Sequence, residues 1–263
     1  MGLYIEVIRT AFKQSFAYRL NTYISTITSV FSLVVLVNIW SSLFHNQSMV
    51  KGIQLPDMIN YIIVSALIGS LIDSSIHTKI GTKVVDGSLS LDFIKPMNFK
   101  FYMFAEQLGD NLFRLLFNTI PACLLVALIW GFHPPTQPYQ IIFFIISLIN
   151  GLILCYYFNF ILGLFVFYLD SPFFIDWVSA ALFQLFAGAF VPLWFYPTFL
   201  YNISMYLPFR LFTFEPISIF VGKTDFSGSL SVIGLQFLWI AVFVAVEKML
   251  WNNAHKIVDI HGG

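Results

Sequence analysis

Long apolar segments separated by short polar intervals are the feature that most constrains this chain. Residues 22–44 contain no charged side chain, and about 20 such residues suffice for a helix to cross a bilayer. The whole chain is 59% hydrophobic and 10% charged, whereas a soluble domain carries roughly 25% charged residues. So few charges could not cover the surface of a soluble fold of this length. The sequence therefore predicts one integral membrane domain, and its net charge of zero gives no sign of a nucleic-acid partner.

Six segments have the length and hydropathy of membrane-spanning helices, so the predicted fold is all-α. Their ranges are 22–44, 57–76, 101–130, 141–169, 173–190 and 230–251. The second span ends near Asp73, which we interpret as an interfacial acid because His77 and Lys79 follow closely. Asp170-Ser171-Pro172 ends the fourth span, and Asp176 lies near the start of the fifth.

The N-terminal residues 1–20 are amphipathic. Apolar side chains recur at helical spacing on one side, and Glu6, Arg9 and Lys13 fall on the other. This pattern predicts an interfacial helix that lies on the bilayer rather than a cleavable signal. Lys and Arg gather at both termini and in the interval after the second span, which places both ends of the chain in the cytoplasm of a multi-pass cell-membrane protein.

Residues 77–100 form the longest charge-bearing interval. Its bases outnumber its acids: the bases are Lys79, Lys83, Lys95 and Lys100, and the acids are Asp86 and Asp92. Two glycines and Pro96 rule out one straight helix. The interval predicts a short helix, from Ile76 to Val85, followed by a turn at the membrane surface. A soluble partner could apply force to the membrane domain at such an element.

Glu106, Asp110 and Arg114 lie at i, i+4 and i+8, on one face of the third span. Such a stripe could line a polar path. All three residues fall in the first half of the segment, which favours headgroup-level residues at the base of the helix.

Residues 191–223 are aromatic and interrupted by prolines, too broken for a straight span and too apolar for a solvated loop. Short helices that dip into the outer leaflet fit this pattern. Arg210 and Glu215 lie within it. They either pair with each other or remain two interfacial charges in contact with water.

Two motifs resemble those of the permease subunits of ABC-2 type ABC exporters, and the likeness extends over essentially the whole chain. Residues 85–96 are similar to the run that follows the coupling helix in that family, and residues 207–223 resemble a segment of the branch that includes daunorubicin-type and viologen-type export permeases. The motif positions are Lys95, where that branch often has Arg, Pro96, Pro208, Arg210 and Pro216.

This resemblance implies a fold with a coupling helix after the second span and re-entrant helices before the sixth. It also implies a dimeric membrane domain, often of two different permeases, bound to two copies of a separate ATPase that carries ATP and Mg²⁺. The residues expected to contact that ATPase are Lys79, Ile80, Thr82, Lys83, Val85, Asp86, Gly87 and Leu89. An apolar, aromatic path between the permeases implies an amphipathic or lipid-like cargo, a drug or a peptide.

The chain offers no catalytic, metal or cofactor site of its own. Gly222-Lys223-Thr224 resembles the end of a phosphate-binding loop, but Ile217 occupies the position where that loop needs glycine. Cys123 and Cys155 lie inside apolar segments and are expected to be small buried hydrophobes. The alternative function is a secondary transporter or channel driven by an ion gradient. It would require ionisable residues deep in several spans, whereas the middles of most spans here lack charge.

Overall fold

The computed structural model describes residues 2–45, 47–72, 75–88, 91–92, 95–166 and 173–261. Within these ranges the regular elements are helices, apart from one isolated bridge between Val50 and Ile53. Asp73, Leu89 and residues 170–172, which the sequence analysis singled out, lie outside the described residues, as does the side chain of Val85.

Among the described residues, five helical stretches are long and apolar enough to cross a membrane, which confirms the prediction of an all-α membrane fold. They are Leu20–Leu43, Leu55–Val84, Phe99–Trp130, Pro138–Phe165 and Phe226–Trp251. The first stretch corresponds to α2 (Arg19–Leu43), the second to α3 (Leu55–Ile72) and α4 (Ile76–Val85), and the third includes α6 (Phe99–Arg114) and α7 (Ile120–Trp130). The fourth is α8 (Pro138–Phe165), and the fifth is the larger part of α12 (Phe226–His261). The remaining predicted span corresponds to a shorter apolar helix, α9 (Phe173–Phe186).

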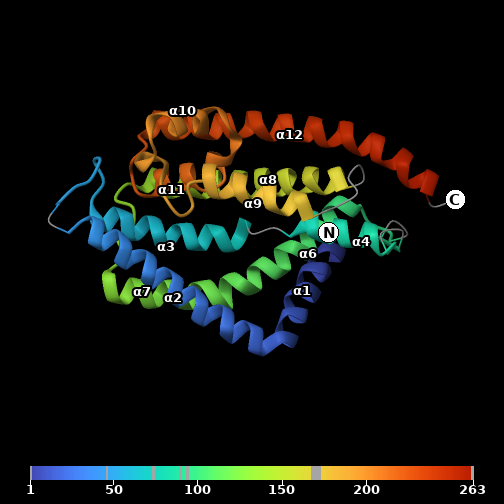
Figure 1. The fold of residues 1–263 in the computed structure, drawn as a ribbon, viewed down its shortest axis with the longest axis horizontal. Helices are drawn as coiled ribbons and strands as arrows, with labels where there is room; N and C mark the ends of the chain where they lie inside the picture. The colour runs from blue at the N-terminus through green and yellow to red at the C-terminus, as the bar shows by residue number, and fades with distance from the viewer. Residues whose placement is uncertain are drawn as a thin grey trace.

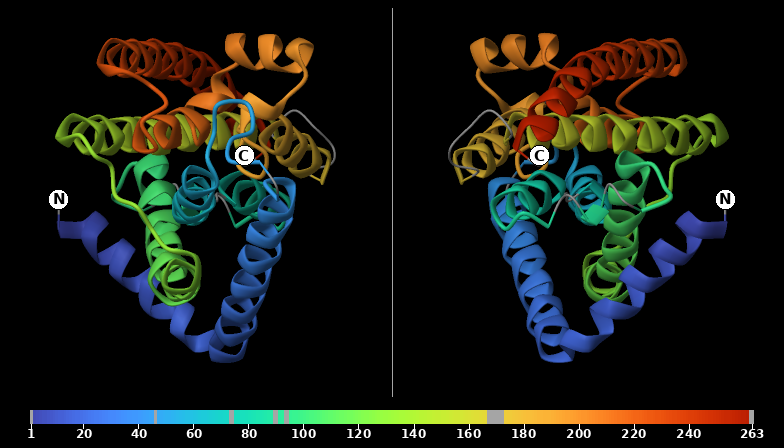
Figure 2. Two further views of the ribbon diagram at one scale, coloured as in Figure 1. Left: turned by 90° about the vertical axis from the view of Figure 1, so that its left-hand side faces the viewer. Right: turned by 90° about the vertical axis from the view of Figure 1, so that its right-hand side faces the viewer.

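The helices are arranged in layers (Figures 1 and 2). Helix α12 lies with α10 (Thr198–Tyr206) on one side of α8 and α9, and α3 and α4 lie on the other side. Beyond α3, α2 and α1 (Gly2–Ser15) diverge from a common corner and partly enclose α6 and α7. The end of α12 and helix α4 point toward one end of the molecule, and α10 and α11 (Phe214–Phe220) lie toward the other. This arrangement agrees with a polar surface at one membrane face and the re-entrant helices at the opposite face.

Helix α1 packs closely along α6, at a point where α6 has no side chain. A Cβ atom built on Gly109 would lie 2.5 Å from the carbonyl oxygen of Ile8 and 2.8 Å from the Cβ of Ala11. Phe12 and Phe16 then meet Phe113 edge to face, with ring centroids 5.7 and 4.9 Å apart. Part of the apolar side of the N-terminal helix therefore packs on α6, whereas Leu3, Ile5 and Phe16 remain exposed.

The third predicted span contains a wide turn. Leu115–Thr119 is π-helical, and the amide of Ile120 donates to the carbonyl of Leu115. Pro121 follows directly and has no N–H to donate to Phe117 in a regular helix. The hydroxyl of Thr26, on α2, instead donates to the Phe117 carbonyl at 3.2 Å. A proline and a side chain from a neighbouring helix thus account for the interruption.

Helix α9 ends at Phe186, four residues before the predicted end of the fifth span at Phe190. The cause is Gly188, which has φ +70° and at which an added Cβ atom would lie 3.1 Å from Phe214 Cβ and 3.3 Å from Leu193 Cγ. The carbonyl of Ala187 accepts a hydrogen bond from the amide of Phe214 at 3.2 Å. The chain therefore turns into the outer segment here. This segment consists of 3-10 turns at Leu193–Phe195 and Pro208–Leu211, together with α10 and α11.

Candidate functional site

Helix α4 is the short helix expected after the second span. Its C-terminal end is formed by the amide of Asp86, which donates to Thr82, and by a turn at Gly87, where φ is +74°. The carboxylate of Asp86 accepts the amide of Ser88 at 2.9 Å. A left-handed glycine beside a self-bonded Asp is a standard way to end a helix and reverse the chain.

Lys79 ties α4 to α6. Its ammonium group lies 2.8 Å from Asp110 Oδ2 and 3.4 Å from Glu106 Oε1. Asp110 also accepts the hydroxyl of Ser15, at the end of α1, at 3.3 Å. One lysine therefore neutralises two acids of α6 and, through Asp110, links α4 to the N-terminal helix.

His77 and Thr78 tie α4 to α9. His77 Nε2 lies 2.9 Å from Asp176 Oδ1, and the hydroxyl of Thr78 donates to the same oxygen at 3.0 Å. Asp176 is in the first turn of α9, where a negative charge also interacts favourably with the helix dipole. The sequence placed Asp176 in the fifth span without assigning it a partner.

Ile80 ties α4 to α8 by close packing. Its side chain is fully buried, and a Cβ atom on Gly163 would lie 2.6 Å from Ile80 Cδ1 and 3.4 Å from the Cα atom of His77. Glycine at this position of α8 lets the two helix backbones approach. Through these three sets of contacts α4 is attached to α6, α8 and α9.

Lys83 and Lys95 share one acid, Asp92. Lys83 and Lys95 each donate to a different oxygen of its carboxylate, and Lys95 also lies 4.1 Å from the centre of the Tyr102 ring. Burial acts to raise the pKa of Asp92, but the hydrogen bonds and charges of the two lysines outweigh it and hold that pKa below its ordinary value. We call Lys83, Asp92 and Lys95 the lysine clasp, because it fastens the segment after α4 to the end of α4.

The residues expected to contact an ATPase thus fall into two sets. Ile80 is buried, and Lys79 and Lys83 are bonded to acids of this chain. Thr82, Asp86 and Gly87 are exposed. The basic face that the sequence suggested for a partner therefore points largely into the protein, and the end of α4 presents a small polar surface.

The stripe of Glu106, Asp110 and Arg114 lies on one side of α6, as its spacing predicts. Its members do different things: Glu106 and Asp110 pair with Lys79, whereas Arg114 donates to Asn111 at 2.8 Å. Asn111 in turn donates to the carbonyl of Leu71, at the end of α3, at 2.6 Å. The bonds to Lys79 and to the Leu71 carbonyl connect α6 to α4 and α3, and the Arg114–Asn111 bond lies within α6.

The outer segment carries a second set of charges. Arg210 Nη1 pairs with Glu215 Oε1, and both side chains are largely buried. Pro208 and Pro216 on either side are also buried, whereas Pro96 of the other motif is exposed. Lys223 pairs with Asp57, at the start of α3, at 2.8 Å. The pairing interpretation of Arg210 and Glu215 therefore agrees with the structure, and exposure of both charges to water does not.

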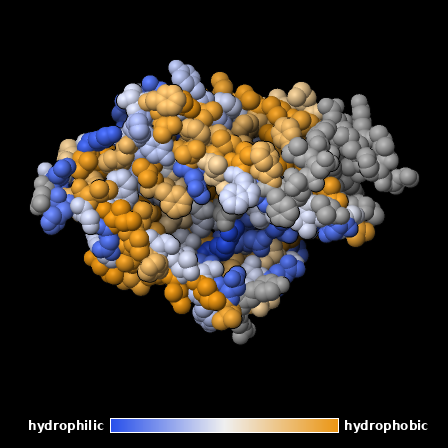
Figure 3. Space-filling view, in the orientation of Figure 1, coloured by the Kyte–Doolittle hydropathy of each residue, from blue (hydrophilic) through white to orange (hydrophobic). Residues whose placement is uncertain are grey.

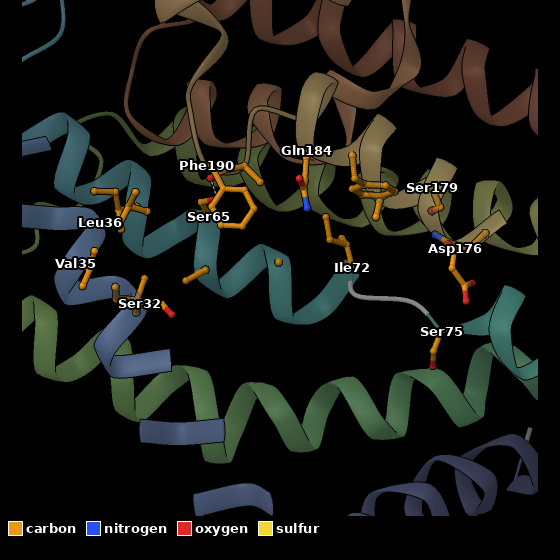
Figure 4. Close-up of a pocket in the computed structure, with 18 of the residues that line it drawn as sticks. Ser32, Val35, Leu36, Ser65, Ile72, Ser75, Asp176, Ser179, Gln184 and Phe190 are labelled. Carbon is orange, nitrogen blue, oxygen red and sulfur yellow. Dashed lines mark hydrogen bonds between the residues drawn. The ribbon is translucent and has the colours of Figure 1, made fainter. Parts of the chain in front are cut away.

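A groove with a volume of about 860 Å³ runs between α2, α3 and α9 and reaches α4. One end is apolar and is lined by residues such as Leu36 and Phe190, and the other is polar and includes Ser75, Asp176 and Ser179 (Figure 4). This face of the molecule is hollowed near its middle, with hydrophilic residues inside and apolar residues around them (Figure 3). The sequence gives no local sign of the groove, because its lining comes from segments far apart in the chain.

The comparison with protein families identifies the class of protein to which this chain belongs. The family model described as ABC-2 family transporter protein matches residues 26–262. The chain belongs to the ABC-2 transporter family. None of the curated proteins compared matches it. Membership of the ABC-2 family makes the chain a multi-pass membrane component of a transporter, and it agrees with the resemblance carried by residues 85–96 and 207–223.

Proposed function

We propose that this ABC-2 family chain is the permease subunit of an ABC exporter, and that α4 transmits the movement of a separate ATPase to the spans. The observation that carries the proposal is the attachment of α4 to three other helices within four residues. His77 and Thr78 bond to α9, Lys79 bonds to α6, and Ile80 packs on α8. A displacement of α4 would therefore displace all three helices together.

The free end of α4 is the surface proposed for the ATPase. Thr82, Asp86 and Gly87 are exposed there, next to the part of the chain predicted to be cytoplasmic. In this proposal two copies of the ATPase bind two permeases, this chain and a second copy or a homologue. ATP-driven closure of the ATPase pair brings the two α4 helices together, which is a rigid-body switch of the kind that packed helices support.

The cargo path in this proposal follows the groove between α2, α3 and α9. The groove extends from the polar residues beside α4 to the apolar residues near Phe190. Its volume of about 860 Å³ lies within the roughly 300–1,000 Å³ typical of small-molecule sites. An amphipathic or lipid-like cargo matches this lining. In this proposal the chain lies in the cell membrane with both termini in the cytoplasm.

The test separates binding of the ATPase to α4 from transmission of the ATPase movement to the spans. Affinity-tagged chain is purified from its native membranes, and the amount of co-purifying ATPase, its ATP hydrolysis and cargo-stimulated turnover are measured. Thr82→Arg should reduce the retained ATPase, because the added side chain obstructs the exposed end of α4. The matched control is Thr10→Arg, on the exposed side of α1, and it should retain the ATPase.

Lys79→Met should retain the ATPase but lose cargo-stimulated turnover, because it releases α6 from α4. The matched control is Lys13→Met, which removes an exposed lysine of α1. Full ATPase retention by Thr82→Arg together with normal turnover by Lys79→Met would refute the assignment of α4 as the coupling helix.

A further inference from the structure

The groove between α2, α3 and α9 is asymmetric in charge. Of the described residues that line it, Asp176 is the one carboxylate, and none is lysine or arginine. Most of the remaining lining is aliphatic or aromatic, with hydroxyl and amide groups concentrated toward α4, among them Ser75, Asn159 and Ser179. His77, which is bonded to Asp176, is the other ionisable residue of the described lining. An acid at one end of a groove that has no lysine or arginine is complementary to a cation with an apolar body.

Asp176 is positioned to accept a further hydrogen bond. His77 and Thr78 both contact its Oδ1 atom, at 2.9 and 3.0 Å. Within the part of the chain that the structure describes, Oδ2 makes no hydrogen bond, and the side chain is 37% exposed. The two contacts from α4 therefore hold one oxygen of a carboxylate whose side chain remains partly exposed.

The rest of the groove is suited to an apolar tail. Ile62, Ala66 and Gly69 of α3 form one wall, and Phe31, Val35 and Ile39 of α2 form another. A Cβ atom on Gly69 would meet nothing within 4 Å, so the space beside α3 is open. Figure 4 shows Asp176 and Phe190 in separate parts of the groove, with Ile72 and Gln184 between them.

We infer that the groove binds a protonated amine with an apolar tail, whose N–H groups donate to Asp176 and whose tail lies along α2 and α3. This inference rests on the proposed cargo path and specifies the chemical class of the cargo. Asp176 selects the charge, and the hydroxyl groups near it offer further acceptors to an ammonium group. The bond from Asp176 to α4 also places the headgroup beside the helix proposed to move on ATP binding.

The lining favours an amine with N–H donors over a quaternary ammonium ion. Quaternary ions are typically held by the faces of Trp and Tyr rings, and neither residue type lines the groove in the described part of the chain. A quaternary ion also has no N–H to donate to Oδ2 of Asp176. The three aromatic lining residues are Phe31, Phe183 and Phe190.

Three matched probes test the inference. Monodansylcadaverine is a fluorescent primary amine with an apolar tail, its N-acetyl derivative is neutral, and its N-trimethyl derivative is quaternary. Binding is measured by fluorescence to the purified transporter in lipid nanodiscs, with empty nanodiscs as the blank. We expect the primary amine to bind about tenfold more tightly than either derivative, as one hydrogen bond to a charged group would give.

Asp176→Asn should reduce the affinity for the primary amine about tenfold and leave the N-acetyl derivative unchanged. That unchanged binding also reports an intact groove. Glu6→Gln is the matched control, because it removes the same charge from the exposed side of α1, and it should change neither affinity.

Equal affinity of the wild-type protein for the primary amine and the N-trimethyl derivative would overturn the inference. Unchanged amine affinity in Asp176→Asn would also overturn it. ATPase retention, measured on the same preparations, separates this failure from a failure of the proposed function. A transporter that retains its ATPase through α4 but shows no amine preference contradicts the cargo class alone.

Discussion

The close approach of α1 and α6 gives a prediction whose size follows from the structure. Gly109→Ala adds a Cβ atom 2.5 Å from the Ile8 carbonyl oxygen and 2.8 Å from Ala11 Cβ. Cβ contacts this short are not tolerated, and neither neighbour is the end of a flexible side chain, so α1 must move away from α6. Overpacking of this kind lowers the free energy of unfolding by about 1–3 kcal/mol.

Alanine is also a better helix former than glycine by about 0.8–1.0 kcal/mol, and this gain has to be separated from the clash. Gly234→Ala provides the reference, because Gly234 lies within α12 and an added Cβ meets nothing within 4 Å. Both variants gain the same helix propensity, so their difference isolates the clash. We expect Gly109→Ala to be less stable than Gly234→Ala by about 1–3 kcal/mol.

The assay uses the two native cysteines, Cys123 and Cys155, which are both buried. A fluorogenic thiol reagent therefore reports unfolding during a thermal ramp in detergent. Each kcal/mol lost from the free energy of unfolding lowers Tm by about 2–4 °C for a chain of this size. A Gly109→Ala protein that melts at or above the Tm of Gly234→Ala would refute the close packing of α1 on α6.

Three further predictions concern charge and topology. Arg210→Ala and Glu215→Ala should each destabilise the protein, and the double variant should be about 1–3 kcal/mol more stable than the sum predicts; strict additivity in the same thermal assay would contradict a direct pair. Because the pKa of Asp92 is lowered, the lysine clasp should contribute its full stability above the ordinary carboxyl pKa of 3.8 and lose it only as the pH falls below that value. The Tm difference between the wild type and Asp92→Asn should therefore be the same at pH 5 and pH 8. A smaller Tm difference at pH 5 than at pH 8 would contradict the clasp. Cysteines introduced at Ser48 and Ser227, both exposed, should react with an impermeant thiol reagent in intact cells, whereas one at Ser88 should react only after permeabilisation.

Local signals in the sequence indicated the long helices, the end of α4 and the broken outer segment, but not the early end of α9 or the wide turn at Leu115–Thr119. Glycine and charge marked the end of α4 at Gly87, and the apolar runs marked the long helices. Prolines marked the broken outer segment. Each of these features depends on neighbours within a few residues, so hydropathy and turn chemistry report them directly.

The partners of the charged residues could not be predicted in the same way. Lys79 finds its acids on α6, 27 and 31 residues further along the chain, and their spacing alone does not show which helix faces them. From the sequence alone, Lys79 and Lys83 therefore indicate a partner-facing surface, whereas the structure pairs Lys79 with Asp110 and Lys83 with Asp92. Asp176 had a weak signal, as an acid in the first turn of a helix, but that pattern equally describes an ordinary helix end. The early end of α9 had a clearer signal at Gly188, which the apolar run around it obscured.

The wide turn at Leu115–Thr119 sets which face of α7 meets α3. Each residue of an α-helix advances the direction of the side chains by about 100°. A π-helical turn holds one residue more than an α-helical turn, so the extra residue is accommodated here without that rotation. If the stretch became a regular helix with every residue kept, the buried side chains of α7, Ala122, Cys123 and Val126, would turn away from α3, whose Ile63 carbonyl lies 3.7 Å from Cys123. Homologues that lack the wide turn should therefore have one residue fewer in this stretch.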